Sequence, residues 1–442
     1  MDSDGGFMYI EPRLYRGMRD ILPSEMLSRE DMLQIVRETF RTWGFAPLAT
    51  PAIEFKDILL GKYGAEAERL FYKIEHKEDL ALRYDLTVPL ARTAAMNTNE
   101  FPTPFKRYQI QEVWRAERAQ PRQGRFREFL QCDVDTIGTE SLVADAEIIS
   151  LSVEILGKLG FPNAVTRLNH RLLLKGLMEV AGFSPDSETE ICRIIDKLDK
   201  IGVDGVRSEL DESGFDETKV DVLFAIILTK EADESLLSRL ETEWGDNARI
   251  AKGIADLRKV IALTTGFGAS KSCLKLDLSL SRGLDYYTGT IFESTVPDQP
   301  HIGSLTGGGR YDDLIGLFSK KEIPAVGITI GLDRILAALA DAGRIEDRKT
   351  PTRVLVTVFN ENLIDDSIKL AKKLRAENIA AEVYLEFRKL KTQFAYADKL
   401  DIPFVAILGE DEIDREVISL KDMKSGTQRE VSFDNLLEAV KL

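Results

Sequence analysis

The sequence predicts an α+β fold with a second, smaller α/β domain at its carboxyl end, and three observations support this. Residues 105–114 and 128–135, on either side of a charged loop, are rich in the aromatic and β-branched residues that strands favour. Residues 171–260 show helical spacing of apolar residues between acidic turns, with little strand signal. Beyond residue 350, strand and helix patterns alternate, which predicts a small sheet flanked by helices.

The other elements of the first domain follow from apolar spacing and from glycines. Apolar residues recur at helical spacing over residues 24–43, and a strand-like run continues to residue 51. A second helix is predicted at residues 144–159. Leucines alternate with polar residues over 276–281, which predicts a half-buried strand.

Two glycine-containing segments follow this strand. Gly307-Gly-Gly-Arg-Tyr311 predicts a glycine loop, which is either a tight turn or a place where the backbone approaches a nucleotide or amino acid. After Gly331, apolar side chains trace one face of a helix that closes near Gly343.

The second domain follows a polar linker at residues 343–351. Its predicted elements are a strand at 353–359, a helix at 365–376, a strand at 382–386, a helix at 390–399, a strand at 404–408, two strands that turn at 424–426 and a final helix. The expected domains are therefore residues 1–340, with a helical insertion at about 171–260, and residues 350–442.

The composition is that of an ordinary globular protein. The chain has 442 residues, 44% of them apolar and 30% charged, which is enough for two or three domains with their own cores. No stretch approaches twenty consecutive apolar residues, so no membrane span is expected. The acidic amino terminus lacks an apolar signal core, and we expect a cytoplasmic protein. Three cysteines and three histidines, widely spaced, predict neither a disulfide framework nor a zinc site.

The net charge of −15 argues mildly against a nucleic-acid partner, because phosphate contacts need positive potential. The local distribution matters more than the sum. Residues 115–127 contain five arginines, and residues 388–391 form a second basic island in an acidic chain. The acidic excess elsewhere would keep the protein soluble and limit nonspecific binding.

Two short polar segments carry the candidate chemistry. The turn Arg282-Gly-Leu-Asp-Tyr-Tyr-Thr-Gly289 gathers a guanidinium, a carboxylate and two phenolic hydroxyls. The loop at 115–127 gathers arginines, whose guanidinium forks donate two parallel hydrogen bonds to paired oxygens such as those of phosphate. Taken alone, the loop is equally compatible with a solvated hairpin tip. A tyrosine pair often serves core packing, but the convergence of Arg, Asp and two Tyr in one short turn favours a functional site.

Together these segments resemble the histidyl-tRNA synthetase family of class II aminoacyl-tRNA synthetases, nearly end to end. The similar segments are the family's opening at 15–23, motif 1 at 44–51, motif 2 at 105–135, motif 3 at 327–334, and the histidine-binding segments at 82–87 and 282–289. The order and spacing of all these segments carry the resemblance, since motif 3 alone is a weak signal.

The resemblance implies an antiparallel sheet with flanking helices for residues 1 to about 340, and an anticodon-binding domain beyond. It implies activation of L-histidine by ATP to an adenylate, followed by transfer of histidine to the terminal ribose of tRNA(His). It also implies Mg²⁺ bound with the ATP, for which the sequence identifies no protein ligand, and a homodimer formed through motif 1.

The resemblance further implies two catalytic arginines, Arg115 and Arg282, that hold the α-phosphate from opposite sides. Displacement at phosphorus needs in-line positioning and neutralisation of charge more than it needs an acid or base, which suits arginines. The residues implied to bind ATP are Arg115, Glu117, Arg125, Phe129 and Arg334. Of these, Arg125 and Arg334 would meet the outer phosphates, while Glu117 lies near the adenine and Phe129 stacks on it.

The residues implied to bind histidine are Asp85, Leu86, Thr87, Arg115, Gln131, Asp135, Arg282, Tyr286 and Tyr287. A neutral imidazole has one N–H donor and one acceptor nitrogen, which a carboxylate and a tyrosine hydroxyl can satisfy. By position in the motifs, Asp135 and Tyr286 are implied to take these roles, with Tyr287 lining the pocket. Asp85, Thr87 and Gln131 match the residues around the α-amino group.

Two other classes of protein fit part of the pattern. One is a noncatalytic relative, the synthetase-like regulatory subunit of ATP phosphoribosyltransferase, and the other is a plain tRNA-binding or sensor module. The regulatory relatives generally lose the Arg-Gly-Leu-Asp-Tyr-Tyr signature and the anticodon-binding domain, and both are indicated here. A tRNA-binding module would not need the complete set of ATP arginines.

Overall fold

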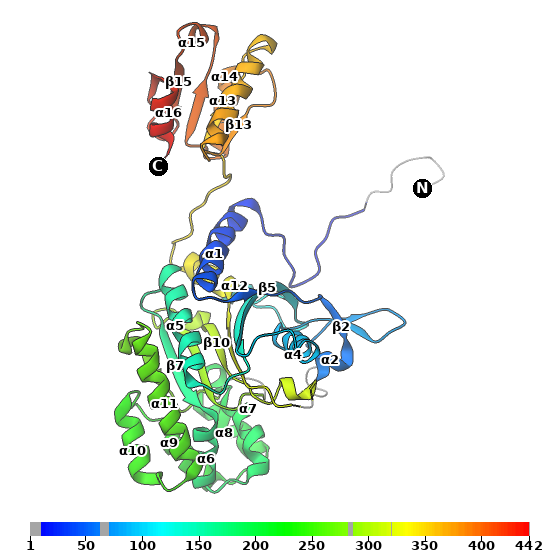
Figure 1. Cartoon of the computed structure of the whole chain (residues 1–442), viewed down its shortest axis with the longest axis vertical. Coiled ribbons are helices and arrows are strands. Elements are labelled where there is room, and N and C mark those ends of the chain that lie inside the picture. The colour runs from blue at the N-terminus through cyan, green and yellow to red at the C-terminus, as the bar shows by residue number, and fades with distance from the viewer. Residues whose placement is uncertain (1–9, 62–69, 282–285, 320, 442) are drawn as a thin grey trace. The chain divides into compact units, whose positions relative to one another are not determined.

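The computed structural model of the chain describes residues 10–61, 70–281, 286–319 and 321–441. The chain divides into two compact units (Figure 1). One comprises residues up to 19 together with 32–344, and the other comprises 20–31 together with 345–442. Helix α1 (Pro23–Thr42) corresponds to the predicted first helix. None of the helices in the described ranges combines the length and apolar character needed to cross a membrane.

The first unit is built on an eight-stranded sheet in the order β1-β5-β6-β11-β10-β9-β7-β8. Its strands are Ala46–Pro47 (β1), Phe105–Trp114 (β5), Glu128–Ile137 (β6), Val165–His170 (β7), Leu274–Leu276 (β8), Thr290–Thr295 (β9), Ser304–Arg310 (β10) and Ala325–Ile330 (β11). All neighbouring pairs from β5 to β7 are antiparallel, whereas the outermost pairs, β1–β5 and β7–β8, are parallel. The predicted α+β class with a mainly antiparallel sheet is confirmed, and so is the hairpin of β5 and β6 around the charged loop.

Two helices of the first unit pack on the sheet. Helix α5 (Leu142–Lys158) contacts β10 through a hydrogen bond between the Ser152 and Thr306 hydroxyls, 3.2 Å apart. Helix α12 (Leu332–Asp341) follows β11 directly. These helices correspond to the ones predicted at 144–159 and after Gly331.

A smaller antiparallel sheet positions the segment that precedes helix α4. Its strands are Ile53–Phe55 (β2), Leu80–Leu82 (β4) and Lys73–Ile74 (β3), and its helices are α2 (Lys56–Leu60) and α4 (Thr87–Met96). Leu59, Ala81 and Val88 from three of these elements share one apolar core with Tyr84. The Tyr84 hydroxyl donates to the carbonyl oxygen of Leu59 at 3.1 Å, which fixes the backbone next to Asp85.

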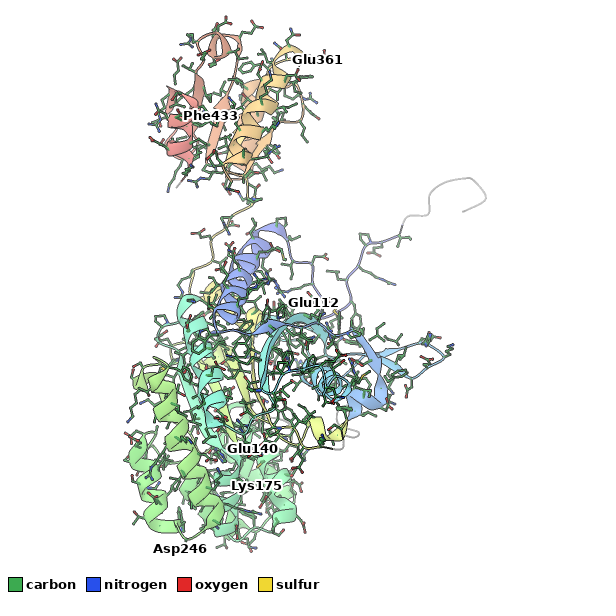
Figure 2. The ribbon with its side chains drawn as sticks, in the orientation of Figure 1. Glu112, Glu140, Lys175, Asp246, Glu361 and Phe433 are labelled. Carbon is green, nitrogen blue, oxygen red and sulfur yellow. The ribbon has the colours of Figure 1, made fainter. Side chains whose placement is uncertain are left out.

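The predicted helical insertion is confirmed between β7 and β8. It comprises α6 (Arg171–Val180), α7 (Glu188–Ile195), α8 (Leu198–Glu212), α9 (Glu217–Ile227), α10 (Glu234–Trp244) and α11 (Ala248–Gly266). Asp216, Asp233 and Asn247 cap helices α9, α10 and α11, because their side chains accept the first backbone N–H groups. Figure 1 shows these helices gathered in green, and Figure 2 shows Lys175 and Asp246 within them, away from Glu112 on β5.

The strand predicted at residues 276–281 is wrong for most of its length. Strand β8 ends at Leu276, and Asp277 begins a turn instead. Its carboxylate accepts hydrogen bonds from the N–H and the hydroxyl of Ser279, at 2.9 and 2.6 Å. An aspartate that binds its own backbone two residues on favours a turn over a strand ladder. Leu278 and Leu280 are nevertheless buried.

The glycine loop predicted at residues 307–311 is also wrong, because these residues belong largely to strand β10. The glycines allow close approach across the sheet. A Cβ atom on Gly308 would overlap the carbonyl oxygen of Gly327 in β11, and one on Gly309 would lie 2.9 Å from the ring of Tyr287. Because Gly309 has no side chain, the ring of Tyr287 can lie directly against the backbone of β10.

The second unit contains a five-stranded sheet in the order β13-β12-β14-β15-β16. Its elements are β12 (Val354–Val356), α13 (Ile364–Ala376), β13 (Ala381–Val383), α14 (Leu390–Lys399), β14 (Phe404–Ile407), α15 (Glu410–Asp414), β15 (Ile418–Asp422), β16 (Gln428–Val431) and α16 (Phe433–Val440). Leu370 of α13 and Leu436 of α16 pack with Val354 and Val356 on one face, whereas Ala397 of α14 packs with Leu355 on the other. The predicted alternation of strands and helices is confirmed.

Candidate active site

One face of the main sheet carries buried polar side chains on three adjacent strands. The strand register gives the cross-strand rows Arg107–Asp135–Gly327 and Gln109–Asp133–Thr329, with Gln111 opposite Gln131. Buried polar groups are costly unless they are paired with one another or with a ligand, so a polar face inside a sheet indicates a functional site.

Asp135 lies in the middle of this polar face. Its Oδ2 atom is 2.7 Å from Nη2 of Arg107, and its Oδ1 atom accepts a hydrogen bond from the hydroxyl of Tyr311. A Cβ atom on Gly327 would overlap Oδ1, so glycine at that position leaves the room that the carboxylate occupies. Burial raises the pKa of Asp135, and the Arg107 guanidinium and the Tyr311 hydroxyl oppose that rise.

The two tyrosines predicted to line the histidine pocket lie in the same cluster. The ring centroids of Tyr286 and Tyr287 are 4.5 Å apart, and their hydroxyls are 3.3 Å apart. The ring of Tyr286 also meets that of Tyr311 edge to face at 5.8 Å. Tyr311 therefore connects the tyrosine pair to Asp135, and the three residues predicted at the imidazole are brought together.

Two of the three residues predicted around the α-amino group, Asp85 and Thr87, lie at the start of helix α4, whereas Gln131 lies on β6. The Asp85 carboxylate accepts the N–H of Val88 at 3.2 Å. Burial raises the pKa of Asp85 to about 6, while that hydrogen bond and the charges of Arg115 and Arg107 act in the opposite direction. The side chain of Leu86 is fully buried in the core, so only its backbone is available to a ligand. Thr87 is partly exposed as the first residue of the helix.

A pocket of about 240 Å³ opens between the β5–β6 loop and the start of α12. Its lining includes all the residues predicted to bind ATP, namely Arg115, Glu117, Arg125, Phe129 and Arg334, together with Gln131 and Thr329. The Nε atom of Arg115 donates to the carbonyl oxygen of Tyr84 at 2.9 Å, and its guanidinium lies 5.1 Å from the ring centroid of Phe129. The predicted ATP residues are thus brought together, and their individual roles stay a prediction.

The backbone of the loop between β5 and β6 packs closely against the backbone at the start of α12. Gly124 has a φ of +65°, and a Cβ atom there would overlap the carbonyl oxygen of Asp333 and approach Cα of Arg334 to 2.8 Å. Arg334 donates to the carbonyl oxygen of Ser304 at 2.7 Å. The close approach of Gly124 to the start of α12 therefore brings the arginines of the loop to the same pocket as Arg334.

Two buried polar atoms at this pocket have no hydrogen-bond partner among the residues that the structure describes. They are Nε of Arg125 and Oε1 of Gln131. The amide nitrogen of Gln131 is already engaged, because it donates to the hydroxyl of Thr329 at 3.2 Å. A buried donor and a buried acceptor of this kind are groups that a bound phosphate and a bound ammonium can satisfy.

The catalytic residue predicted at Arg282 lies outside the described residues. The structure adds Arg107, Asp133 and Tyr311, which sequence reasoning missed. A signal for Arg107 was available, since polar residues alternate with Tyr108 and Ile110 in a segment that was itself predicted to be a strand. Tyr311 gave no such signal, because 176 residues separate it from Asp135 in the chain.

Asp133 has a strongly displaced pKa within the polar face. Burial and the neighbouring Asp135 carboxylate raise its pKa to about 7, and Arg107 and the Thr329 hydroxyl oppose the rise. Aspartate in the unfolded chain has a pKa of about 3.9. Between pH values of about 3.9 and about 7, Asp133 is therefore protonated in the folded state and ionised in the unfolded state. Folding stability from this group is therefore greatest at low pH and is lost as the pH rises through about 7.

We expect Asp133→Asn to raise the free energy of unfolding by up to about 4 kcal/mol at pH 8, and by only about 1.5 kcal/mol at pH 5. The amide removes the buried charge while its oxygen still accepts from Thr329. Urea unfolding of both proteins at the two pH values, with ligands absent, measures this. A loss of stability at pH 8 would show that Asp133 is stabilised as a carboxylate.

Comparison with known proteins gives the class and then the family. Residues 17–335 match the family model described as histidyl-tRNA synthetase, and residues 353–441 match an anticodon binding domain. The histidine–tRNA ligase of Cytophaga hutchinsonii is 40% identical over 451 residues, covering 97% of this chain and 99% of the relative. The crystal structure of histidyl-tRNA synthetase from Nostoc sp. PCC 7120 superposes with a TM-score of 0.87 at 32% identity, covering 98% of this chain and 99% of that one.

A further solved structure shares the fold alone. It is described as an ATP phosphoribosyltransferase regulatory subunit/histidyl-tRNA synthetase from Bacillus halodurans C, with a TM-score of 0.73 and 22% identity, covering 89% of this chain and 97% of that one. The fold is that of a class II aminoacyl-tRNA synthetase. Within that class, the chain belongs to the histidyl-tRNA synthetase family.

Proposed function

We propose that this protein attaches L-histidine to tRNA(His) in two steps, through a histidyl-adenylate. One observation carries the proposal. The residues matched to ATP line a single pocket, and Gln131 of that pocket connects through Thr329 and Asp133 to the buried face that holds Asp135. A nucleotide and an amino acid could therefore bind side by side on one sheet face.

Activation of histidine joins its carboxylate to the α-phosphate of ATP. Arg115 has its Nε atom held by the Tyr84 carbonyl oxygen, which orients the guanidinium for contact with both reacting groups. Arg282 would approach the α-phosphate from the other side. Arg125 and Arg334 would neutralise the outer phosphates, and the Phe129 ring offers the adenine a flat apolar surface beside Glu117.

The amino acid would lie with its α-ammonium near Asp85, Thr87 and the unpaired Oε1 atom of Gln131. Its ring would lie against Asp135, Tyr286 and Tyr287, with one carboxylate and one phenol for the two imidazole nitrogens. These contacts are charge-matched at both ends of the substrate. They leave the carboxylate of histidine facing Arg115.

Mg²⁺ would enter this site with ATP. Within the described residues, no group of three or more His, Cys, Asp or Glu side chains is arranged to hold a metal ion. The donor set fits a cation bound mostly through phosphate oxygens and water, since Glu117 and Asp333 are the carboxylates that line the pocket. When bound, the ion would neutralise phosphate charge during the displacement.

The remaining parts of the proposal concern the whole chain. Residues 1–340 would form the catalytic domain and residues 350–442 the domain that binds the anticodon. A cavity of about 650 Å³ shares Arg125 with the ATP pocket and is lined by residues 195–196 and 198–200 of the insertion, which suits entry of the tRNA acceptor end. The protein would act in the cytoplasm as a homodimer, and the half-exposed apolar side chains of Ile53 and Phe55 support an interface near motif 1.

With ATP, Mg²⁺ and radiolabelled histidine, the protein is expected to charge a tRNA(His) transcript and to leave an unrelated transcript uncharged. The arginines of the ATP pocket supply adenylation, and the second unit supplies contacts with tRNA. Acid-precipitable histidine on the transcript measures the reaction. A folded protein that charges no tRNA but associates with an ATP phosphoribosyltransferase would favour the regulatory-subunit alternative.

A further inference from the structure

Both oxygens of Asp135 contact side chains outside the set matched to histidine, one through an ion pair and the other through a hydrogen bond. Arg107 Nη2 lies 2.7 Å from one oxygen, and the Tyr311 hydroxyl binds the other. The Arg107 side chain is fully buried and that of Asp135 is 5% exposed, so both charges have left water. A buried ion pair contributes little net stability, because desolvation offsets the attraction. Its place on the wall of the candidate histidine site calls for another explanation.

The pair is fixed by the backbone as well as by the side chains. Arg107 and Asp135 are direct partners in the β5–β6 ladder, so their separation does not depend on a loop. On the other side of Asp135, the absence of a Cβ atom at Gly327 lets the carboxylate lie against β11. The carboxylate therefore has one orientation. Oδ1 keeps a second lone pair beside the Tyr311 hydrogen bond, and Oδ2 accepts no hydrogen bond from the described residues, so both oxygens can accept from a ligand.

The surroundings of Asp135 would otherwise favour its neutral form. The charged and titratable groups that act on this cluster are Arg107 on β5, Asp133 on β6, Asp85 before α4, Arg115 after β5, and the phenols Tyr311 and Tyr287. Two of these groups, Asp133 and Asp85, are carboxylates whose negative charge disfavours ionisation of Asp135. Burial disfavours its ionisation as well. A neutral carboxyl would present a donor as well as an acceptor, and would no longer select for an N–H group.

We propose that Arg107 is a positioning residue for histidine selection, which keeps the Asp135 carboxylate charged and aimed so that it accepts the N–H of the imidazole. Tyr311 assists by fixing the other carboxylate oxygen. The inference rests on the proposed function, in which Asp135 contacts the ring. Arg107 acts through Asp135 and needs no contact with the substrate.

The test is pyrophosphate exchange by the full-length protein carrying Arg107→Met, which removes the charge at similar volume. At pH 7 the KM for histidine should rise roughly 30- to 100-fold, as expected for loss of a charge-assisted contact, while the KM for ATP changes less than about threefold. Between pH 6.5 and 9 the histidine KM of the variant should fall, because Asp135 ionises only at higher pH. Arg107→Lys keeps the charge without the fork and should recover part of the affinity.

A double-mutant cycle shows whether Arg107 acts through Asp135. In an Asp135→Asn background, Arg107→Met should change the histidine KM by less than about threefold, because the carboxylate it positions is gone. An equally large effect in both backgrounds would overturn the proposal. An unchanged histidine KM in a folded Arg107→Met protein would do the same.

The matched control is Arg310→Met. Arg310 is also a buried arginine paired with a buried aspartate, Asp145 of α5. It lies on the face of β10 opposite to the one where Gly309 meets Tyr287. This variant should lose stability with little change in the histidine KM. If Arg107→Met fails to fold, Tyr311→Phe takes its place in the test. It removes only the hydrogen bond from the Tyr311 hydroxyl to Asp135 and should raise the histidine KM several-fold. An unchanged KM would then overturn the proposal. Wild-type protein without histidine-dependent exchange would refute the proposed function itself, a separate outcome.

Discussion

Arg115→Ala is expected to slow formation of histidyl-adenylate by about 10³. Arg115 lies in the candidate ATP pocket with its Nε atom held by the Tyr84 carbonyl oxygen, and its guanidinium lies near the Phe129 ring. Truncation removes a preorganised donor that would contact both the histidine carboxylate and the α-phosphate as charge develops. Single-turnover measurements with saturating ATP and histidine report the chemical step directly.

Arg122→Ala is the matched control, because Arg122 is an exposed arginine of the same loop that does not line the pocket. It should keep the adenylation rate within about threefold of the wild type, since exposed charges contribute little. Equal rates for Arg115→Ala and Arg122→Ala would mean that Arg115 has a structural role alone.

Asp135→Ala is expected to weaken histidine binding by roughly 10²–10³, because a buried group that pairs with the substrate loses its contact and leaves Arg107 without its partner. Asp135→Asn keeps an acceptor oxygen and should lose less. Calorimetric titration with histidine measures both dissociation constants. Glu112→Ala, on an exposed position of the same hairpin, should bind histidine as the wild type does.

Thermal unfolding of Asp135→Ala must accompany the titration, since the unpaired Arg107 also costs stability. A folded Asp135→Ala protein with wild-type affinity for histidine would remove Asp135 from the recognition of the ring. Weakened ATP binding of the same size would instead indicate a general collapse of the site.

Local patterns in the sequence predicted the elements well where packing agrees with local preference. Strands β5 and β6 carry aromatic and β-branched residues along their length, and the predicted hairpin is present. The errors arise where particular residues override the local pattern of apolar and polar residues. Asp277 forms a turn with Ser279 within an alternating run, and the glycines of β10 serve close packing across the sheet instead of a loop.

The candidate site divides in the same way. The ATP residues of the β5–β6 loop and α12 could be named from short motifs, and the structure brings them into one pocket. Tyr311 could not be assigned, because it meets Asp135 from a segment 176 residues away in the chain. Arg107 was visible only as a polar position of a predicted strand, and its pairing with Asp135 depends on the register of the β5–β6 hairpin. Cross-strand contacts of this kind depend on register, which short motifs do not report.

The central claim is that this sheet face activates histidine and no other amino acid. The most direct test is ATP–pyrophosphate exchange with each of the twenty standard amino acids in turn. We predict exchange with histidine and a response at least about 10⁴-fold weaker with every other amino acid, since a site with paired buried polar groups rejects side chains that cannot pair with them. Comparable exchange with a second amino acid, or no exchange with histidine, would contradict the account.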